Sequence, residues 1–180
     1  MRTSQKRLFP FVCCAAVLTW AVAQDAGRLP TVEGESLAGQ RIVLPDAAGG
    51  KISVLVFGFT KASKEPTTAW ANKILKDFAA RPDFVLYQLP VLEDVPRFIR
   101  GMVIGGMKKG MQEDKRAHFV PILQKESELK KFVHYNEPDD AYVVVLGRSG
   151  ETLLRTHGSG PGEASYERLR STIDAALAQK

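Results

Sequence analysis

The stretch KISVLVFGFTKASKEPTTAW, from Lys51 to Trp70, decides the fold of this chain. Its apolar run Ile52–Phe59 is rich in β-branched and aromatic residues without polar alternation, which is typical of a central strand covered on both faces. The polar loop 61–66 follows this run. A helical pattern then opens near Pro66, a residue that suits the first turn of a helix. The stretch therefore predicts a strand, a loop and a helix in that order.

The predicted helix continues beyond this stretch with one apolar stripe. Trp70, Ile74 and Phe78 recur at a spacing of four residues, which places them on one helix face. Trp70 could stack on a ligand, but this spacing favours a role in the core. The apolar run 84–91 predicts the next strand, and strand, helix and strand together predict a right-handed parallel crossover.

The sequence on either side of this unit adds a hairpin before it and a mixed set of elements after it. Leu37, Ile42 and Leu44 alternate around a turn at Gly39 and predict a short hairpin. The later elements are a helix over 126–135, a strand over 142–146, a turn at 148–150, a strand over 151–156 and a last helix after Gly162. The predicted fold class is α/β, with a central mixed β-sheet flanked by helices, an N-terminal β-hairpin and a helical insert.

The insert, residues 93–118, has an ambiguous pattern. Apolar residues over 95–102 fit a helix face, yet four glycines interrupt any longer helix, and each glycine costs about 1 kcal/mol relative to alanine. We therefore expect a short helix over 95–102, a glycine-rich joint and a second, basic helical piece over 108–118. The glycines are Gly101, Gly105, Gly106 and Gly110, and they lack the spacing of a phosphate-binding loop.

Three methionines in this insert invite a copper hypothesis. Met102, Met107 and Met111 are spaced near helical repeats, but no cysteine or paired histidine accompanies them. Methionine without such partners is more often a gap-filling residue of the core. We therefore interpret these methionines as core residues and predict neither a metal nor a cofactor.

The first 23 residues have the pattern of a cleaved signal peptide. A basic start precedes a short apolar centre, and Ala21-Val22-Ala23 supplies small residues at a cleavage site. An uncleaved membrane anchor is the alternative, but the apolar run is shorter than the roughly 18 to 20 residues of a spanning helix. We predict cleavage after Ala23, a flexible lead-in over 24–35 and one domain over 36–180. The protein would then be exported, periplasmic or secreted, without stable membrane insertion.

Removal of this segment changes the charge and the cysteine content. It takes away three cations and no acid, so the formal charge falls from +5 to +2, and a basic isoelectric point gives no argument for nucleic acid. Both cysteines, Cys13 and Cys14, lie within it. The expected mature chain therefore has no thiol, which excludes disulfide and thiol peroxidase chemistry.

Two stretches resemble the redoxins, which include peroxiredoxins, TlpA-like oxidoreductases and Sco copper chaperones. SLAGQRIVLPDAAGGKISVLVFGFTKAS is similar to their opening, and AYVVVLGRSGETLLRTHG to their final hairpin. The resemblance covers residues 37–177 and implies a thioredoxin-like fold. Their functional residues do not carry over: Ala62-Ser63-Lys64-Glu65 stands where the C-x-x-C motif would be, and Ser63 where a peroxiredoxin has its thiol. Ala141 precedes the predicted strand where redox members have a cis-proline.

The second half contains the stretch MKKGMQEDKRAHFVPILQKESELKKFVHYNEPDDAYVVVLGRSGETLLRTHGSGPGEASYERL, residues 107–169. This stretch resembles the mitochondrial ATP-synthase assembly factor family, which implies an assembly or chaperone-like role at a membrane complex. In this resemblance a basic segment precedes a helix, a Y-V-x-L strand and an R-x-x-G-x-G exit. The matching positions are Arg116, His118, the strand 142–146, Arg155, Gly158 and Gly160.

These observations favour a redox-inactive binding or assembly protein for an envelope protein or a membrane-complex subunit, rather than an enzyme. Two surfaces are candidates for the contact. The first, which we call the vestigial loop, is Thr60, Lys61, Ala62, Ser63, Lys64, Glu65 and Pro66, and the second, the basic segment, contains Lys108, Lys109, Lys115, Arg116 and His118. Non-thiol chemistry, or binding of a small ligand or anion at the helix N-terminus beside Ser63, remains the alternative.

Overall fold

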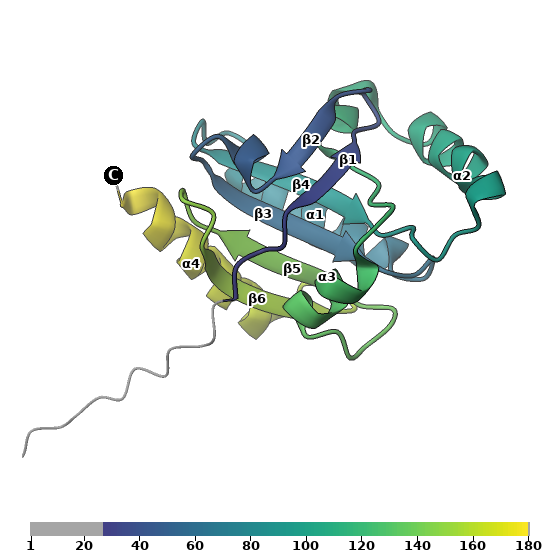
Figure 1. Ribbon diagram of the computed structural model, residues 1–180. Coiled ribbons are helices and arrows are strands. Elements are labelled where there is room, and N and C mark those ends of the chain that lie inside the picture. The colour runs from purple at the N-terminus through teal and green to yellow at the C-terminus, as the bar shows by residue number, and fades with distance from the viewer. Residues whose placement is uncertain (1–26, 180) are drawn as a thin grey trace, which may run out of the picture.

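The computed structural model describes residues 27–179, so the expected signal peptide lies outside the described residues. The chain order agrees with the predicted order of strands and helices (Figure 1). The elements are β1 (Val32–Glu35), β2 (Arg41–Leu44), the 3-10 helix η1 (Asp46–Ala48), β3 (Ile52–Gly58), α1 (Lys64–Phe78), β4 (Phe84–Pro90), α2 (Arg97–Lys109), the 3-10 helix η2 (Glu113–His118), α3 (Glu126–Val133), β5 (Ala141–Leu146), β6 (Thr152–Gly158) and α4 (Glu163–Ala178).

The central sheet is mixed and has the strand order β4-β3-β5-β6. Strand β3 pairs in parallel with β4 and antiparallel with β5, so that Val56 lies opposite Gln88 on one side and Val143 on the other. Strand β6 returns antiparallel to β5. Every residue of β3 and of β5 is buried, as the apolar runs without polar alternation predicted.

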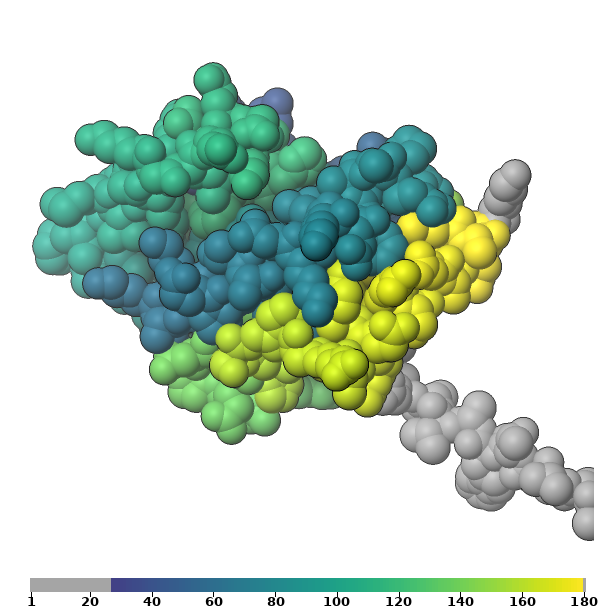
Figure 2. All heavy atoms as spheres, turned by 180° about the vertical axis from the view of Figure 1, so that it is seen from behind, coloured from purple at the N-terminus to yellow at the C-terminus, as the bar shows by residue number. Residues whose placement is uncertain are grey.

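Two hydrophobic layers cover the two faces of this sheet. Helices α1 and α4 lie side by side on one face, as Figure 2 shows from behind. Alternate residues of β3, such as Val54 and Val56, face these helices and pack in one buried cluster with the α1 stripe residues Trp70 and Ile74. The other alternate residues, such as Leu55, pack with the hairpin β1-β2 and with helix α3 in a second cluster. Because successive side chains of a strand point to opposite faces of the sheet, β3 contributes alternate residues to two separate hydrophobic cores.

An extended segment over 119–122 covers the outer edge of β4. The Val120 N–H donates to the Gln88 carbonyl at 2.9 Å, and the Ile122 N–H donates to the Pro90 carbonyl at 2.8 Å. The Leu37 N–H in turn donates to the Phe119 carbonyl at 3.0 Å, which joins the hairpin to this segment. These bonds supply partners to a sheet edge that would otherwise expose its backbone groups.

The lead-in over 24–35 was predicted to be flexible, and its described part is ordered into the fold. Residues 32–35 form β1, which pairs with β2 in the antiparallel hairpin. Leu29 and Val32 are buried in the core beneath the hairpin. The error has a physical cause, because small and polar residues around these two positions hide a strand whose stability comes from its partner.

The insert was also predicted wrongly in its details. Helix α2 runs without a joint from Arg97 to Lys109 through three glycines, and η2 follows as a separate short helix. No residue of α2 is buried, so the interpretation of Met102 as a core residue is wrong. Met107 and Met111 are only partly buried. Helical periodicity predicted an apolar face correctly, but periodicity does not show whether the fold covers that face.

Candidate functional site

The vestigial loop joins the end of β3 to the start of α1 and is closed by its own hydrogen bonds. The Ser63 hydroxyl donates to the Thr60 carbonyl at 2.8 Å. The Ser63 N–H donates to the Thr60 hydroxyl oxygen at 3.1 Å. Ser63 is 1% exposed, so its hydroxyl oxygen points into the protein and is not presented to a ligand.

Gly58, the last residue of β3, makes room for this serine. A Cβ atom at Gly58 would come within 2.6 Å of the Ser63 Oγ atom and 3.0 Å of the Thr67 Cγ2 atom. The strand end and the helix start therefore approach more closely than a side chain at position 58 allows.

We expect Gly58→Ala to lower the free energy of unfolding by about 1 to 2 kcal/mol, because the added methyl group overpacks the strand–helix junction. The double variant Gly58→Ala with Ser63→Ala is expected to lose less than the sum of the two single losses, since it removes the clashing atom. Urea unfolding measures all three variants. Strict additivity would show that Ser63 does not oppose the methyl group.

A second loop, residues 136–140, meets the vestigial loop across the same end of the sheet. The Thr60 hydroxyl donates to the Asp139 carboxylate at 2.9 Å. The neighbouring Asp140 carboxylate lies 2.7 Å from the His157 Nδ1 atom on β6. The His157 ring stacks on Tyr142 with a centroid separation of 5.3 Å. The sequence did not predict this junction, because its residues are distant in the chain and follow no motif.

An aromatic cluster lies beneath the two loops. The Phe59 ring packs edge to face with Tyr135 at 5.0 Å and with Tyr142 at 5.6 Å between centroids. The Lys130 ammonium lies 4.8 Å from the centroid of Tyr135 and forms an ion pair with Glu126. The hydrogen bond from Lys130 to Glu126 raises the pKa of Lys130, so this cation stays charged over the aromatic rings. The i,i+4 spacing of Glu126 and Lys130 was the one sequence signal for this pair.

The other residues of the vestigial loop are mostly at the surface. Lys61, Lys64 and Glu65 are exposed, while Pro66 is buried in the first turn of α1. The anion hypothesis combined the Ser63 hydroxyl with the backbone amides near Pro66 and the charge of Lys61 and Lys64. The hydroxyl of Ser63 is instead bonded to Thr60, which leaves this hypothesis with the amides and the surface lysines.

The basic segment does not form one continuous surface. Lys108, at the end of α2, lines a groove of about 240 Å³ together with Glu35 at the hairpin and Ile104. His118, at the end of η2, instead packs on the Tyr87 ring with 5.3 Å between centroids. The Arg116 guanidinium donates from Nε to the Met111 carbonyl at 3.2 Å. Lys109 and Lys115 are exposed.

Acid is expected to destabilise the fold through His118. Burial lowers the pKa of His118 below its ordinary value of 6.5, and the positive charge of Lys51 lowers it further. The unfolded chain therefore binds this proton more readily, and the free energy of unfolding decreases as the pH falls through about 6.5. Urea unfolding of His118→Gln between pH 7.5 and 5 should show a smaller decrease than the wild type.

The variant Lys51→Gln is a graded control for this prediction. It removes one of the two causes of the lowered pKa, so its pH dependence should lie between those of the wild type and His118→Gln. Identical pH dependence in all three proteins would contradict the assignment to His118.

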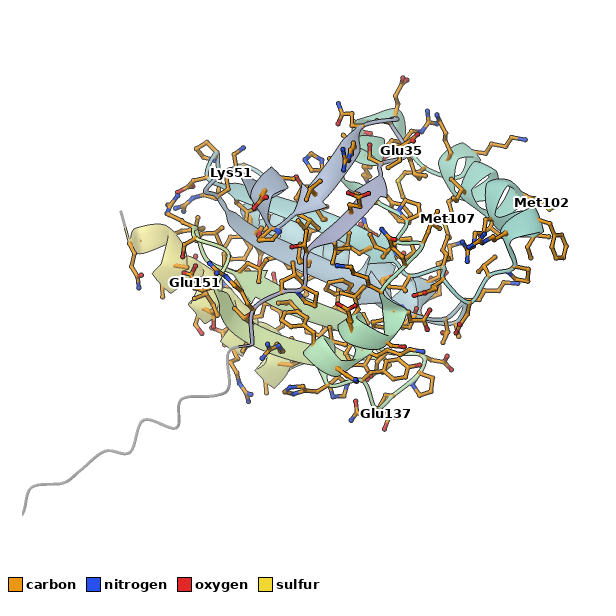
Figure 3. The ribbon with its side chains drawn as sticks, viewed as in Figure 1. Glu35, Lys51, Met102, Met107, Glu137 and Glu151 are labelled. Carbon is orange, nitrogen blue, oxygen red and sulfur yellow. The ribbon has the colours of Figure 1, made fainter. Side chains whose placement is uncertain are left out.

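A larger surface hollow lies at the opposite end of the sheet. It measures about 600 Å³ and is lined by residues such as Arg148 and Glu151 at the β5-β6 turn and Ser171 on α4. Figure 3 shows Glu151 on the left of the molecule and Glu137, in the second loop of the site, well apart from it at the lower edge. Arg148 is already paired with Asp83 at 2.8 Å, and Glu151 accepts a hydrogen bond from Ser149. This hollow is therefore no part of the candidate site.

Residues 27–179 contain no group of three or more His, Cys, Asp or Glu side chains placed to hold a metal ion. No helix in this described part of the chain combines the length and the apolar character that a membrane crossing requires.

Comparison with solved structures defines the class of fold. The chain resembles BsSco, a member of the Sco family of cytochrome c oxidase assembly proteins, with a TM-score of 0.56 and 13% identity over 85% of this chain and 95% of that one. It resembles a putative thiol:disulfide interchange protein DsbE from Chlorobium tepidum with a TM-score of 0.57 and 16% identity, over 85% and 97% of the two chains.

A third similar structure is the exposed lipoprotein thioredoxin Etrx1 from Streptococcus pneumoniae, with a TM-score of 0.53 and 12% identity over 81% of this chain and 99% of that one. The predicted thioredoxin-like fold, with its mixed four-stranded sheet, flanking helices and N-terminal hairpin, is thereby confirmed. No protein-family profile matches the sequence. No curated protein sequence matches it either.

Proposed function

We propose that this protein is an exported, redox-inactive member of the thioredoxin-like class that acts as a binding or assembly factor for an envelope protein or a membrane-complex subunit. The observation that supports this proposal most directly is that the vestigial loop presents no reactive side chain at the position of the expected thiol. At the strand–helix junction where thioredoxin-like enzymes present a thiol, this chain has Ser63, buried and bonded to the Thr60 carbonyl.

The chemistry of this position supports binding rather than turnover. A serine hydroxyl attacks a substrate only when a neighbouring base takes its proton. The Ser63 hydroxyl donates to the Thr60 carbonyl and accepts from the Thr60 N–H at 3.4 Å, and neither of these groups is such a base. The sequence has no cysteine after position 14, so no thiol can replace it within residues 15–180.

The loops around this position support a contact surface. Thr60 and Asp139 tie the vestigial loop to the loop 136–140, and the aromatic cluster beneath them holds both loops on the sheet. Lys61, Lys64 and Glu65 remain exposed above this support. A rigid loop that presents charged side chains loses little conformational freedom when it binds.

Assembly proteins on this fold give the proposal a precedent. The similar structure BsSco is described as a member of a family of cytochrome c oxidase assembly proteins. That likeness concerns the fold, so the role of this chain needs its own test.

Affinity purification of the tagged chain from its native envelope, followed by mass spectrometry, tests the proposal. We expect a protein partner whose recovery falls at least about tenfold when the exposed lysines of the vestigial loop (Lys61→Glu with Lys64→Glu) or the cations of the basic segment are reversed in charge. The segment variant carries glutamate at Lys108, Lys109, Lys115 and Arg116. A variant with Lys76→Glu and Lys131→Glu is the control, because both of these lysines are exposed on other helix surfaces.

The melting temperature of each variant must stay within about 2 °C of the wild-type value. Loss of the partner can then be attributed to the changed surface and not to unfolding of the protein. Unchanged recovery in both variants would reject these surfaces. Reduction of peroxide or of insulin disulfides by the purified chain alone, without a thiol protein, would reject the redox-inactive role.

A further inference from the structure

Helix α2 carries an apolar face that the rest of the described chain does not cover. Phe98 is 88% exposed and Met102 is 76% exposed, the two most exposed large hydrophobic residues between positions 27 and 179. They lie one turn apart on the same side of the helix. Figure 3 shows Met102 on the outer side of α2 and Met107 on the side turned toward the rest of the molecule. Figure 1 shows α2 standing apart from the sheet.

The glycines of α2 do not serve the packing of the fold. A Cβ atom added at Gly101, Gly105 or Gly106 would meet nothing within 4 Å. Gly101 and Gly105 flank Phe98 and Met102 along the helix, so these two side chains project above a low surface. Alanine would give a more stable helix at the same positions. Packing within the described fold therefore explains neither the exposed apolar pair nor the glycines beside it.

The positive charge of α2 limits which kinds of partner can bind its exposed apolar face. The helix contains four cations and no carboxylate within Arg97–Lys109. Arg100 donates from Nε to the Val95 carbonyl at 2.7 Å, which ties the start of the helix to the preceding loop. The other three cations, Arg97, Lys108 and Lys109, are exposed.

This charge disfavours a second copy of the chain, because two α2 helices in contact would bring their cations together. The acidic residues nearest the helix lie outside it: Glu93 and Asp94 before it, Glu113 and Asp114 after it, and Glu35 on the hairpin, which lines a groove together with Lys108. A surface with phosphate groups beside an apolar layer complements both properties of the helix: its exposed apolar pair and its positive charge.

We propose that α2 docks the protein on the surface of an anionic phospholipid bilayer. Phe98 and Met102 enter the boundary between headgroups and acyl chains, and Lys108, Lys109 and Arg97 contact lipid phosphates. With 13 residues the helix is too short to span a bilayer, so it lies in the plane of the interface. This inference goes beyond the proposed function and does not depend on it, since no protein partner takes part.

Vesicle flotation tests the inference with two lipid compositions, phosphatidylcholine alone and an equal mixture of phosphatidylcholine and phosphatidylglycerol. The wild type and all variants are purified by the same route and compared in the same processed form. We expect binding to the anionic vesicles at low salt, with at least a roughly tenfold weaker partition in about 0.5 M salt. Hydrogen exchange on the bound protein should show protection of the α2 amides.

Two variants separate the apolar and the electrostatic contributions. The apolar variant combines Phe98→Ser with Met102→Ser, and the charge variant combines Lys108→Glu with Lys109→Glu. We expect each of these double variants to weaken binding to anionic vesicles at least about tenfold. Matched controls are Leu153→Ser, at an exposed leucine on β6, and Lys76→Glu with Lys131→Glu. Both controls should bind as the wild type does.

Several results would overturn the inference. These are absence of binding to anionic vesicles, equal binding to phosphatidylcholine alone, or binding that neither α2 variant weakens. Self-association of the wild type in sedimentation experiments that Phe98→Ser abolishes, without vesicle binding, would assign the face to a second copy. Capture of a protein by the wild type in the absence of lipid, lost in the same variant and without vesicle binding, would assign it to a protein partner.

Discussion

Replacement of Trp70 by alanine is expected to lower the free energy of unfolding by about 3 to 5 kcal/mol, the largest loss that we predict for this protein. Trp70 is fully buried between the sheet and helix α4. Its indole N–H donates to the Gly158 carbonyl at 3.2 Å, which joins α1 to the end of β6. Its ring lies 6.4 Å from the Tyr166 ring of α4. The variant loses packing and a hydrogen bond together, and urea unfolding measures the sum.

Two further variants separate these contributions. Trp70→Phe keeps an aromatic ring but loses the indole N–H, so its loss should be clearly smaller than that of alanine. Leu153→Ala removes a partly exposed leucine on β6 and should cost less than about 1 kcal/mol. An alanine variant at position 70 that unfolds like the Leu153 variant would contradict the role of Trp70 in the core.

Replacement of Tyr142 by phenylalanine is expected to cost about 2 kcal/mol and to loosen the second loop of the candidate site. The Tyr142 hydroxyl oxygen accepts hydrogen bonds from the N–H groups of Asn136 at 2.9 Å and Glu137 at 2.8 Å. The same hydroxyl has one proton to donate, either to the Glu137 carbonyl at 2.9 Å or to the Asn136 side chain at 3.2 Å. One phenol thus organises the backbone of the loop 136–140.

Hydrogen exchange should show faster exchange at Asn136 and Glu137 in this variant, because their N–H groups lose their partner. The matched control is Tyr87→Phe, which removes a single hydroxyl bond to the Ala47 carbonyl near the other end of the sheet. Exchange over 136–140 should be unchanged in that control. Unchanged exchange over 136–140 in Tyr142→Phe would contradict the role of the Tyr142 hydroxyl in ordering this loop.

The two proposed contact surfaces have different physical characters. The vestigial loop is a charged rim above an aromatic cluster, and Thr60 ties it to Asp139 by a hydrogen bond. Helix α2 is instead an exposed apolar face with flanking cations, and its Phe98 has no cover within residues 27–179. The variant Lys61→Glu with Lys64→Glu should lose protein capture and keep vesicle binding, and Phe98→Ser with Met102→Ser should do the reverse, so these two variants separate the proposed function from the inference about the bilayer. Charge reversal at Lys108 and Lys109 affects both surfaces, because both lysines lie in α2.

Most of the fold could be predicted from local patterns. The buried strands β3 and β5 follow from apolar runs without alternation, and α1 follows from the stripe at Trp70, Ile74 and Phe78. Strand β1 could not be predicted, because Val32 is a strand residue only through its pairing opposite Leu44. The segment 119–122 escaped prediction for the same reason, since its partners on β4 lie about 30 residues away in the chain.

The sequence by itself determined the thioredoxin-like order of elements and the absence of cysteine from residues 15–180, because covalent composition and local periodicity do not depend on tertiary contacts. Only the tertiary structure decided that Ser63 faces inward, that Thr60 meets Asp139 and that the Phe98 face of α2 stays uncovered. Each of these properties depends on how close distant parts of the chain come, and a periodic pattern carries no information about that distance.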